Sequence, residues 1–303
     1  MNKTIHHLLH PREGASLVLR NYLKDCFSDK TYLQILYYLT FGKKLDLEHP
    51  KTFQEKLQWI KLYDRKPIYH TMVDKYECKE FISSRVGGGY TIPTLGIYNS
   101  FEEIEWEKLP EKFIMKATHD SGSYYLVKDK KKLNLKECKK RLCAHWNQDY
   151  YSFYREWQYK GIKPRIIVEP LLNDGKGEYL TDYKFYTFNG EPKILYITSN
   201  RGSRGGVKEN FFDLSGNELD IVQDGYRNTG AAPKLPNNMQ TMIDVARILA
   251  KDTYHLRVDF YEIDNKVLCG ELTLMEGAGL CDFAPEHWNR DFGDWIKLPT
   301  DKN

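Results

Sequence analysis

The sequence lacks most of the features that mark a chain for a membrane, a nucleic acid or a disulfide scaffold. No stretch approaches the roughly 18 apolar residues of a membrane-spanning helix, and the N-terminus has no apolar core of signal-peptide length. The net charge is only +3, so we expect no nucleic-acid partner. The six cysteines form no CxxC pair, which argues against zinc and redox motifs. We therefore predict reduced thiols in a cytoplasmic protein.

The chain also lacks several motifs of nucleotide and sugar chemistry. It has no Walker A order of GxxxxGK, and no D-x-D, with which glycosyltransferases commonly hold a metal. No internal repeat or low-complexity linker divides it. Its 303 residues are therefore compatible with one large domain or two coupled ones.

Two segments stand out by composition. The run YLQILYYLTFG at 32–42 is the most apolar one, and it fits a packed helix, with weak docking on a membrane surface as the alternative. The run KDKKKLNLK at 128–136 is the only dense basic one. It fits a solvated loop better than a nucleic-acid patch.

The first 90 residues or so are predicted to be mainly helical. Thr52 followed by Glu55 is a capping box that opens a helix over 53–63. A second helix is predicted from about 71 to 85, and the glycines at 87–89 end it because glycine tolerates the left-handed cap.

The remainder of the chain is rich in strand signals. From about residue 91, short segments of β-branched and aromatic residues alternate with turns, and Asn189-Gly190 is a hairpin signal between two of them. Helices are expected near 135–146 and 239–250. Strands grouped in hairpins with interspersed helices predict an α+β fold.

The most informative segment is a predicted hairpin that carries Asp259 and Glu271. If residues 264–266 form a three-residue loop, these two acids lie directly opposite each other, with Cβ atoms roughly 4.5–5.5 Å apart. Two such carboxylates repel unless a cation lies between them, and Mg²⁺ prefers oxygen ligands. In the same register Arg257 faces Thr273 on that side. A two-residue loop would put the acids on opposite faces, and two ordinary surface acids are the alternative.

Two further segments carry weaker signals. A predicted strand delivers Lys116 and then a small-residue loop over His119–Ser123, where lysine and loop N–H groups suit phosphate, although a plain turn is the alternative. The apolar strand at 166–172 enters a loop whose backbone could meet an adenine edge. Asp182 and Lys184 then alternate onto one strand face, which also fits a salt-bridging edge.

The order of these motifs resembles the ATP-grasp superfamily. DK, KATHDSGS, VEPLL, DYKFY, RVD and GELT follow one another, and over roughly 45–299 the chain is similar to the TupA-like ATP-grasp family of bacterial surface-polysaccharide and teichuronopeptide biosynthesis. The resemblance implies an ATP-grasp fold with ATP between two α+β subdomains. After a helical segment over 1–90, we expect an ATP-grasp domain over 91–303, with a lysine-loop subdomain at about 91–168 and a metal-binding one at about 169–303.

The resemblance also implies an activity and its cofactors. The family points to an ATP-dependent carboxylate–amine ligase that uses ATP and Mg²⁺ and forms an amide through an acyl phosphate. Its partners would be a small-molecule or saccharide carboxylate, such as a uronic or amino acid, and an amine. A glycosyltransferase and a nucleotide-binding scaffold without turnover are the alternatives.

Roles at the nucleotide follow from the same resemblance. Lys75 and Lys116 match the motifs that contact phosphate, and Asp182 matches the acid beside the ribose. The lid over the phosphates matches His119, Ser121, Gly122 and Ser123. The adenine hinge matches Glu169, Pro170 and Leu172. Because proline has no N–H, Pro170 would offer only its carbonyl and Leu172 would supply the N–H. Asp120 stands where glycine often follows histidine, and it would repel a triphosphate unless its side chain points away.

Catalytic and metal roles come from the later motifs. Arg257 and Lys116 match cations that stabilise the transferring phosphoryl group, and Lys184 matches one that faces the acyl phosphate. Asp259 and Glu271 match the metal ligands, with Thr273 where most family members have asparagine.

Two pairs of side chains have open roles at the acceptor. Arg201 and Arg204 could hold an anionic acceptor or lie in a solvated loop. Trp288 and Trp295 could stack on sugar or belong to the core.

Overall fold

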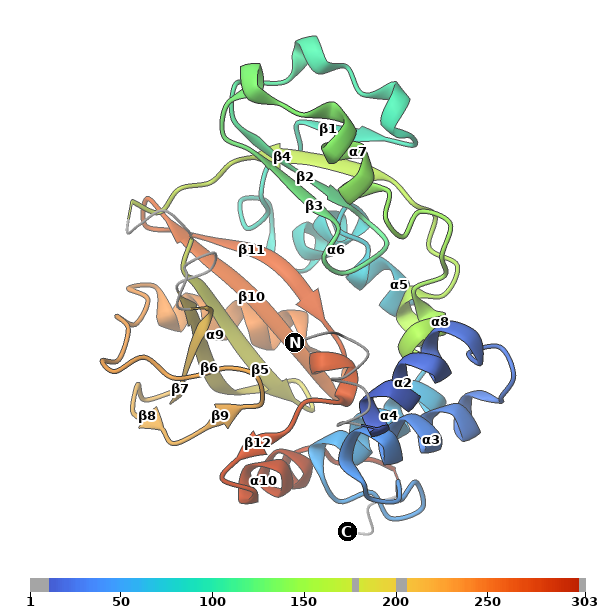
Figure 1. Ribbon diagram of the computed structural model, residues 1–303. Helices are drawn as coiled ribbons and strands as arrows, with labels where there is room; N and C mark the ends of the chain where they lie inside the picture. Colours follow the sequence, from blue (N-terminus) through green and yellow to red (C-terminus); the bar gives the residue numbers. More distant parts are fainter. Residues whose placement is uncertain (1–10, 176–179, 200–205, 300–303) are drawn as a thin grey trace.

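The computed structural model describes residues 11–175, 180–199 and 206–299. It contains two main antiparallel sheets with helices around them, which confirms the predicted α+β class (Figure 1). The helices are α2 (Pro11–Tyr22), α3 (Asp29–Phe41), α4 (Phe53–Tyr63), α5 (Ile68–Val73), α6 (Glu77–Val86), α7 (Leu135–Leu142), α8 (Tyr151–Tyr154), α9 (Met239–Leu249) and α10 (His287–Trp295). The strands are β1 (Gly96–Tyr98), β2 (Phe113–Ala117), β3 (Tyr124–Val127), β4 (Ile166–Pro170), β5 (Asp182–Phe188), β6 (Glu191–Ser199), β7 (Lys208–Asp213), β8 (Glu218–Leu219), β9 (Val222–Gln223), β10 (His255–Ile263), β11 (Lys266–Thr273) and β12 (Phe283–Ala284).

The apolar run at 32–42 lies in helix α3. Ser28 caps the helix by accepting a hydrogen bond from the Thr31 N–H, and Gly42 ends it in the left-handed conformation at φ 68°. Four of its large side chains are buried, namely Tyr32, Leu33, Leu36 and Tyr37. This burial favours the packed-helix interpretation of the run. Within the described ranges, no helix has the length and apolar content to cross a membrane.

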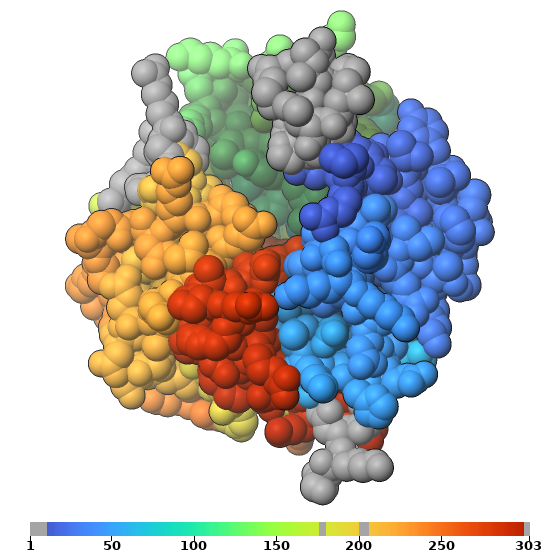
Figure 2. Space-filling model, turned by 60° about the horizontal axis from the view of Figure 1, so that its bottom comes forward, coloured from blue at the N-terminus to red at the C-terminus, as the bar shows by residue number. Residues whose placement is uncertain are grey.

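Helix α4 joins the N-terminal helices to the C-terminal end of the chain. Its predicted capping box is present, because Thr52 accepts from the Glu55 N–H while the Glu55 side chain accepts from the Thr52 N–H. Phe53 and Leu57 are fully buried in the main core. Figure 2 shows the C-terminal segment, in red, packed against the N-terminal helices, in blue. The helix is therefore enclosed between two parts of the protein that are far apart in sequence.

The single helix predicted over 71–85 is wrong, because the chain breaks at Asp74. The Asp74 backbone leaves the helical region at ψ 119°, and its side chain accepts from the N–H groups of Tyr76 and Glu77. A short acidic side chain that binds nearby N–H groups competes with helix continuation in this way. Helices α5 and α6 result, with Lys75 at the corner between them. Helix α6 ends at Gly87, as predicted, but at φ 85° and ψ 167°, which lies outside the left-handed helical region.

The smaller sheet has the order β1-β4-β2-β3, and every pairing in it is antiparallel. Phe113 and Met115 on β2, with Ile166 and Val168 on β4, form its buried side. Helix α7 packs on this side, which Figure 1 shows above the larger sheet. The connection from β2 to β3 is the segment that carries the predicted lysine loop.

The larger sheet has the order β11-β10-β5-β6-β7-β8. The predicted Asn189-Gly190 hairpin joins β5 to β6, with φ of 46° and 85° at the two turn residues. Helix α9 covers one side and buries Met242, Ala246 and Leu249. This arrangement leaves the central strands β10 and β5 to carry the polar side chains of the candidate site.

The hairpin of β10 and β11 has a different loop length from the one predicted, but Asp259 and Glu271 still pair as predicted. Its loop has two residues, Asp264 and Asn265, both at positive φ, so Ile263 pairs with Lys266 and the three-residue loop is wrong. The register then shifts between Asp259 and Phe260, which inserts Gly270 as an extra residue on β11. A β-bulge of this kind reverses the facing of all residues beyond it.

The bulge puts the two acids of the hairpin on one face. Asp259 lies opposite Glu271, and Arg257 lies opposite Thr273. A Cβ at Gly270 would come within 2.5 Å of the Tyr261 ring, so the close approach at the bulge favours glycine.

Candidate active site

The large sheet holds a buried cluster around Asp259. The Arg257 guanidinium grips this carboxylate with two donors, Nε to Oδ1 at 2.6 Å and Nη2 to Oδ2 at 2.9 Å. Lys184, its register partner on β5, donates to Oδ2 at 2.8 Å. Burial alone would raise the pKa of Asp259, but the charges of Arg257 and Lys184 outweigh it and hold that pKa below its ordinary value. The sheet register therefore unites all three predicted residues.

Glu276 belongs to the same cluster and was missed from the sequence. It lies in the 3₁₀ turn η5 (Glu276–Gly279), and its Oε2 accepts from Arg257 Nη1 at 2.7 Å. Burial would lower the pKa of Arg257, but the carboxylates of Asp259 and Glu276 raise it well above its ordinary range. Arg257 is therefore fixed by acids from two separate segments, a strand and a turn.

The residues predicted to bind metal offer oxygen ligands on one face. Glu271 is 42% exposed at its side chain, and its Oε2 lies 3.5 Å from Arg257 Nη2. The Thr273 hydroxyl is buried and finds no hydrogen-bond partner among the described residues. Two carboxylates and an unsatisfied hydroxyl fit the oxygen preference of Mg²⁺. In the described part of the chain no group of three His, Cys, Asp or Glu is placed to hold a metal ion. Phosphate and water oxygens would therefore have to complete the shell.

The small sheet holds a second cluster, around Glu169. Lys116 Nζ donates to Glu169 Oε2 at 2.7 Å, and Lys79 from helix α6 donates to Oε1. Burial would raise the pKa of Glu169, but the two ammonium groups outweigh it and hold that pKa low. Lys79 was missed from the sequence, although it follows Lys75 by about one helical turn. The Glu169 side chain thus positions two lysines, while the backbone of the predicted hinge, Glu169 to Leu172, has an adenine role only by prediction.

The loop after β2 turns Asp120 inward. Its carboxylate accepts from the Ser123 hydroxyl and pairs with His145 Nδ1 at 2.9 Å, and it is 1% exposed. His119 packs edge-on against Trp146. Asp120, which stands where the family often has glycine, is accommodated because its carboxylate points into the loop. Ser121 and Gly122 of the same loop are exposed.

Lys75 links the two clusters in space. Its ammonium donates to the Asp120 carbonyl, and its backbone N–H donates to the Thr118 carbonyl at 3.2 Å. Burial lowers its pKa, which the charges of Asp120 and Glu271 partly oppose. The charges of Asp120, Glu271 and Lys116 all act on Lys75, so this lysine lies near groups of both sheets.

The other predicted residues have separate locations. Pro170 ends β4, Leu172 follows it in the connection to β5, and Asp182 begins β5 in a buried position on the same face as Lys184. Arg201 and Arg204 lie outside the described residues.

The two C-terminal tryptophans belong to the aromatic core. Trp288 and Trp295 both pack on Phe292, and Trp288 donates its indole N–H to Asp220 at 2.9 Å. Both rings are half-buried and pack against the core, which favours the core-packing interpretation.

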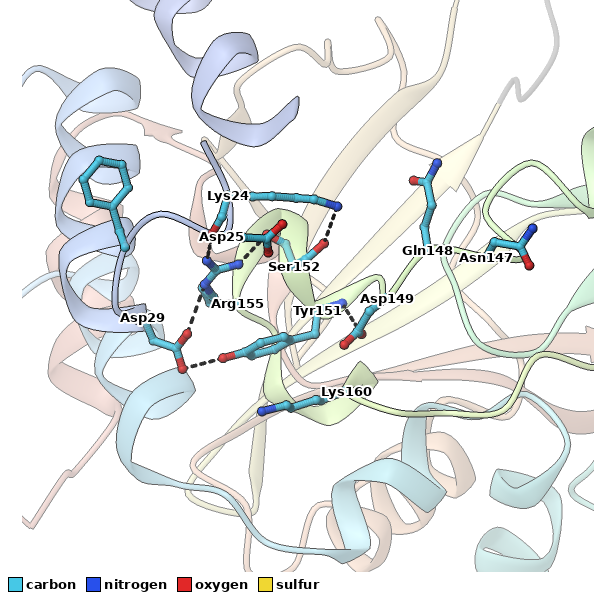
Figure 3. A pocket seen from close by; sticks show the side chains of 11 residues that line it. Lys24, Asp25, Asp29, Asn147, Gln148, Asp149, Tyr151, Ser152, Arg155 and Lys160 are labelled. Carbon is cyan, nitrogen blue, oxygen red and sulfur yellow. Dashed lines mark hydrogen bonds and ion pairs between the residues drawn. The ribbon is translucent and has the colours of Figure 1, made fainter. Parts of the chain in front are cut away.

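An open cavity of about 480 Å³ lies away from both clusters, between the N-terminal helices and helix α8. Figure 3 shows contacts of Arg155, Asp29 and Lys24 with neighbouring groups of its lining. Arg155 pairs with Asp29 and donates to the Ser152 carbonyl, and Lys24 donates to the Ser152 hydroxyl at 3.3 Å. We read these contacts as joining two segments of the fold, and we assign them no chemistry.

Several solved structures are distantly similar to the chain. No curated protein matches the chain. Among solved structures, D-alanine-D-alanine ligase from Helicobacter pylori is 15% identical with a TM-score of 0.42, covering 81% of this chain and 69% of that one. The ATP-grasp ligase PsnB complexed with minimal precursor is 10% identical with a TM-score of 0.42, and the match covers 93% of this chain and 74% of that one. D-alanine-D-alanine ligase from Bacillus anthracis complexed with ATP is 14% identical with a TM-score of 0.42, and the match covers 75% of this chain and 65% of that one.

The family comparison is the decisive one. Residues 55–297, most of the chain, match the model of the family described as TupA-like ATPgrasp. The match spans both clusters, including Lys116 and Glu169 on the small sheet and Arg257, Asp259 and Glu271 on the large one. The chain belongs to the TupA-like ATP-grasp family and has an ATP-grasp fold.

Proposed function

We propose that this protein is an ATP-dependent ligase that joins a carboxylate to an amine through an acyl phosphate. The observation that carries the proposal is the pair of cation–carboxylate clusters, Lys116 with Glu169 on the small sheet and Arg257 with Lys184 and Asp259 on the large one. Preorganised cations in a site shielded from water act strongly on the charge that develops in phosphoryl transfer. Family membership supports ATP as the phosphoryl donor.

The reaction has two steps. A carboxylate oxygen of the substrate forms a bond to the γ-phosphorus while the bond to the β–γ bridging oxygen breaks, and ADP leaves. The amine then attacks the acyl carbon, loses a proton and expels phosphate. In the first step Arg257 and Lys116 would stabilise charge on the transferring group, and Lys184 would face the acyl phosphate.

A divalent cation has a defined place in this proposal. Bound by Asp259 and Glu271 with help from Thr273, Mg²⁺ would supply neutralisation of the phosphate oxygens. The chain itself contributes the cross-strand pairing that keeps both acids on one face. Arg257, two residues before Asp259, shares that face and points to the same carboxylates.

The substrate class rests on family membership. We propose that the carboxylate is carried by a sugar, such as a uronic acid, or by an amino acid, and that the amide becomes part of a bacterial surface polysaccharide. The protein would act in the cytoplasm, with no nucleic-acid partner and at most weak contact with a membrane surface.

The proposal is tested by ligand binding and then by turnover. ATP with Mg²⁺ should raise the melting temperature, because a ligand that binds only the native state stabilises it. Phosphate release, measured over a panel of uronic and amino acids crossed with amines, should require both an acid and an amine. If UDP-sugars stabilise the protein and ATP does not, the ligase proposal is wrong and a glycosyltransferase replaces it.

A further inference from the structure

Helix α4 buries a lysine that the proposed chemistry does not use. Lys61 is 1% exposed, and its ammonium donates to Tyr154 O at 2.9 Å and to Ala278 O at 2.6 Å. A third bond, at 3.0 Å, goes to Gln58 on the same helix. One cation therefore ties together the helix, the end of α8 and the turn η5.

The turn that Lys61 holds has an unusual backbone. Gly277, Ala278 and Gly279 have φ of 49°, 54° and 64°, so three consecutive residues are left-handed. A non-glycine residue such as Ala278 adopts this conformation only where its surroundings enforce it. Gln58 adds to the restraint by donating to Gly279 O at 2.8 Å, and a Cβ at Gly279 would come within 2.6 Å of the Gln58 amide.

The same turn presents Glu276 to the candidate site. Glu276 precedes the left-handed residues, is buried, and binds Arg257 Nη1 at 2.7 Å. A continuous series of contacts therefore runs from Lys61 through the carbonyl of Ala278 and the carboxylate of Glu276 to Arg257. Burial of an ammonium is costly, so a role in packing alone would be served at lower cost by an apolar side chain.

We propose that Lys61 is a positioning residue: it holds turn η5 so that Glu276 sets the Arg257 guanidinium for phosphoryl transfer. The kinetic part of this inference rests on the ligase function proposed above. It gives helix α4, in the N-terminal helical segment, a direct link to the site.

The chain supplies a matched control on the same helix. Lys56 is also buried, and its ammonium donates to a backbone carbonyl, that of Ile296, at 2.7 Å. Lys56→Met and Lys61→Met each remove a buried ammonium from α4. Lys61 bonds to turn η5, whereas the Lys56 bond to Ile296 goes to the C-terminal segment. A general loss of stability would affect both variants, whereas loss of positioning would affect one.

The first experiment compares the phosphate release of both variants with that of the full-length wild type. Lys61→Met should lower kcat by about ten-fold or more with a change in KM for ATP below about three-fold, since a small misplacement of a catalytic cation is costly. Lys56→Met should stay within about three-fold of wild type in kcat. Equal losses in the two variants, or near-normal turnover in Lys61→Met, would overturn the proposal.

A double-mutant cycle tests the route through the turn. Glu276→Gln, combined with Lys61→Met, should lower kcat by no more than about three-fold beyond the worse single variant, because residues that act through one element are not additive. If the two losses multiply, Lys61 does not act through Glu276 and the proposal fails.

Hydrogen exchange separates this inference from the proposed ligase function. Lys61→Met should speed amide exchange across residues 276–280, and Lys56→Met should leave that segment unchanged, with or without any turnover. If Lys61→Met does not fold, Gln58→Leu removes the contact to Gly279 and takes its place. Unchanged exchange in Lys61→Met would contradict the positioning role of Lys61, even if the protein is an active ligase. If the wild type has no ligase activity but the variants show the expected exchange, only the proposed ligase function is contradicted.

Discussion

The two clusters of the candidate site are built alike and restrained differently. Each places a buried carboxylate between two cations, Glu169 on the small sheet and Asp259 on the large one, and each carboxylate has a lowered pKa. The small-sheet cations are both lysines, and one of them comes from helix α6. The large-sheet cluster has Arg257, whose planar fork also binds Glu276.

This difference suggests a division of labour. Lysine presents a point charge on a flexible stem, whereas arginine holds a fixed geometry at two carboxylates. In the proposed ligase the small-sheet lysines would therefore follow a phosphate as it binds, while Arg257 and its acids would form the rigid surface on which the transferring group is stabilised. Changes in the large-sheet cluster should accordingly reduce turnover more.

The largest effect is expected at Glu271, which is proposed above as a metal ligand. Glu271→Gln removes a charge but keeps the side-chain shape, so turnover should fall at least about 100-fold, as with other preorganised charge-stabilising groups. The side chain is 42% exposed, so the melting temperature should change little. Phosphate-release kinetics together with thermal unfolding check both statements. Near-normal turnover would remove the distinction between the two clusters.

A smaller effect is expected for the small-sheet lysines. Lys116→Met should lower turnover by about ten-fold, because one of several cations proposed to contact the phosphates is lost from the site. Lys79→Met removes the other ammonium bound to Glu169 and serves as the matched control, with a loss below about three-fold. Steady-state kinetics over a range of ATP concentrations measures both. A loss in Lys116→Met as large as that in Glu271→Gln would show that the small-sheet cluster is no less critical.

The smallest effect concerns the pH dependence of stability at Glu156, a buried acid near the charges of Lys61 and Glu276. Burial raises the pKa of Glu156 to about 7 from its ordinary 4.5, and the nearby Lys61 charge only partly opposes this shift. The native state therefore binds more protons than the unfolded chain between these pH values, and stability falls as pH rises across that window.

Removal of this acid should abolish that pH dependence. The melting temperature of Glu156→Gln, relative to wild type, should be higher at pH 8 than at pH 5. Thermal unfolding at the two pH values measures the difference. A constant difference, or one of opposite sign, would show that Glu156 is ionised in the native state across this range.

The hairpin of Asp259 and Glu271 shows what sequence patterns can and cannot predict. The strands, the pairing of the two acids and the position of Arg257 were all predicted, although the loop was wrong. The strand pattern left the loop length undetermined, and the bulge at Gly270 compensated for the shorter loop. The pairing of Asp259 with Glu271 was therefore predicted correctly, but it depends on a bulge that the sequence pattern did not predict.

The missed residues have a common cause. Glu276 and His145 reach their partners through turns whose path depends on tertiary packing, which no local periodicity encodes. Lys79 was accessible from its spacing after Lys75, but its partner Glu169 lies on a distant strand. The break at Asp74, in contrast, had a local signal in the sequence. Aspartate often caps helices, but the prediction placed Asp74 inside a helix.

The transfer of oxygen from substrate to phosphate tests the central claim most directly. With a carboxylate substrate labelled with ¹⁸O, an acyl-phosphate mechanism leaves one labelled oxygen in the released inorganic phosphate, alongside ADP in equal amount. Mass spectrometry of phosphate and nucleotide after a single turnover would detect it. The account predicts label in phosphate and none in nucleotide. Label in AMP, with pyrophosphate as the other product, would contradict it, because the carboxylate would then have been adenylated.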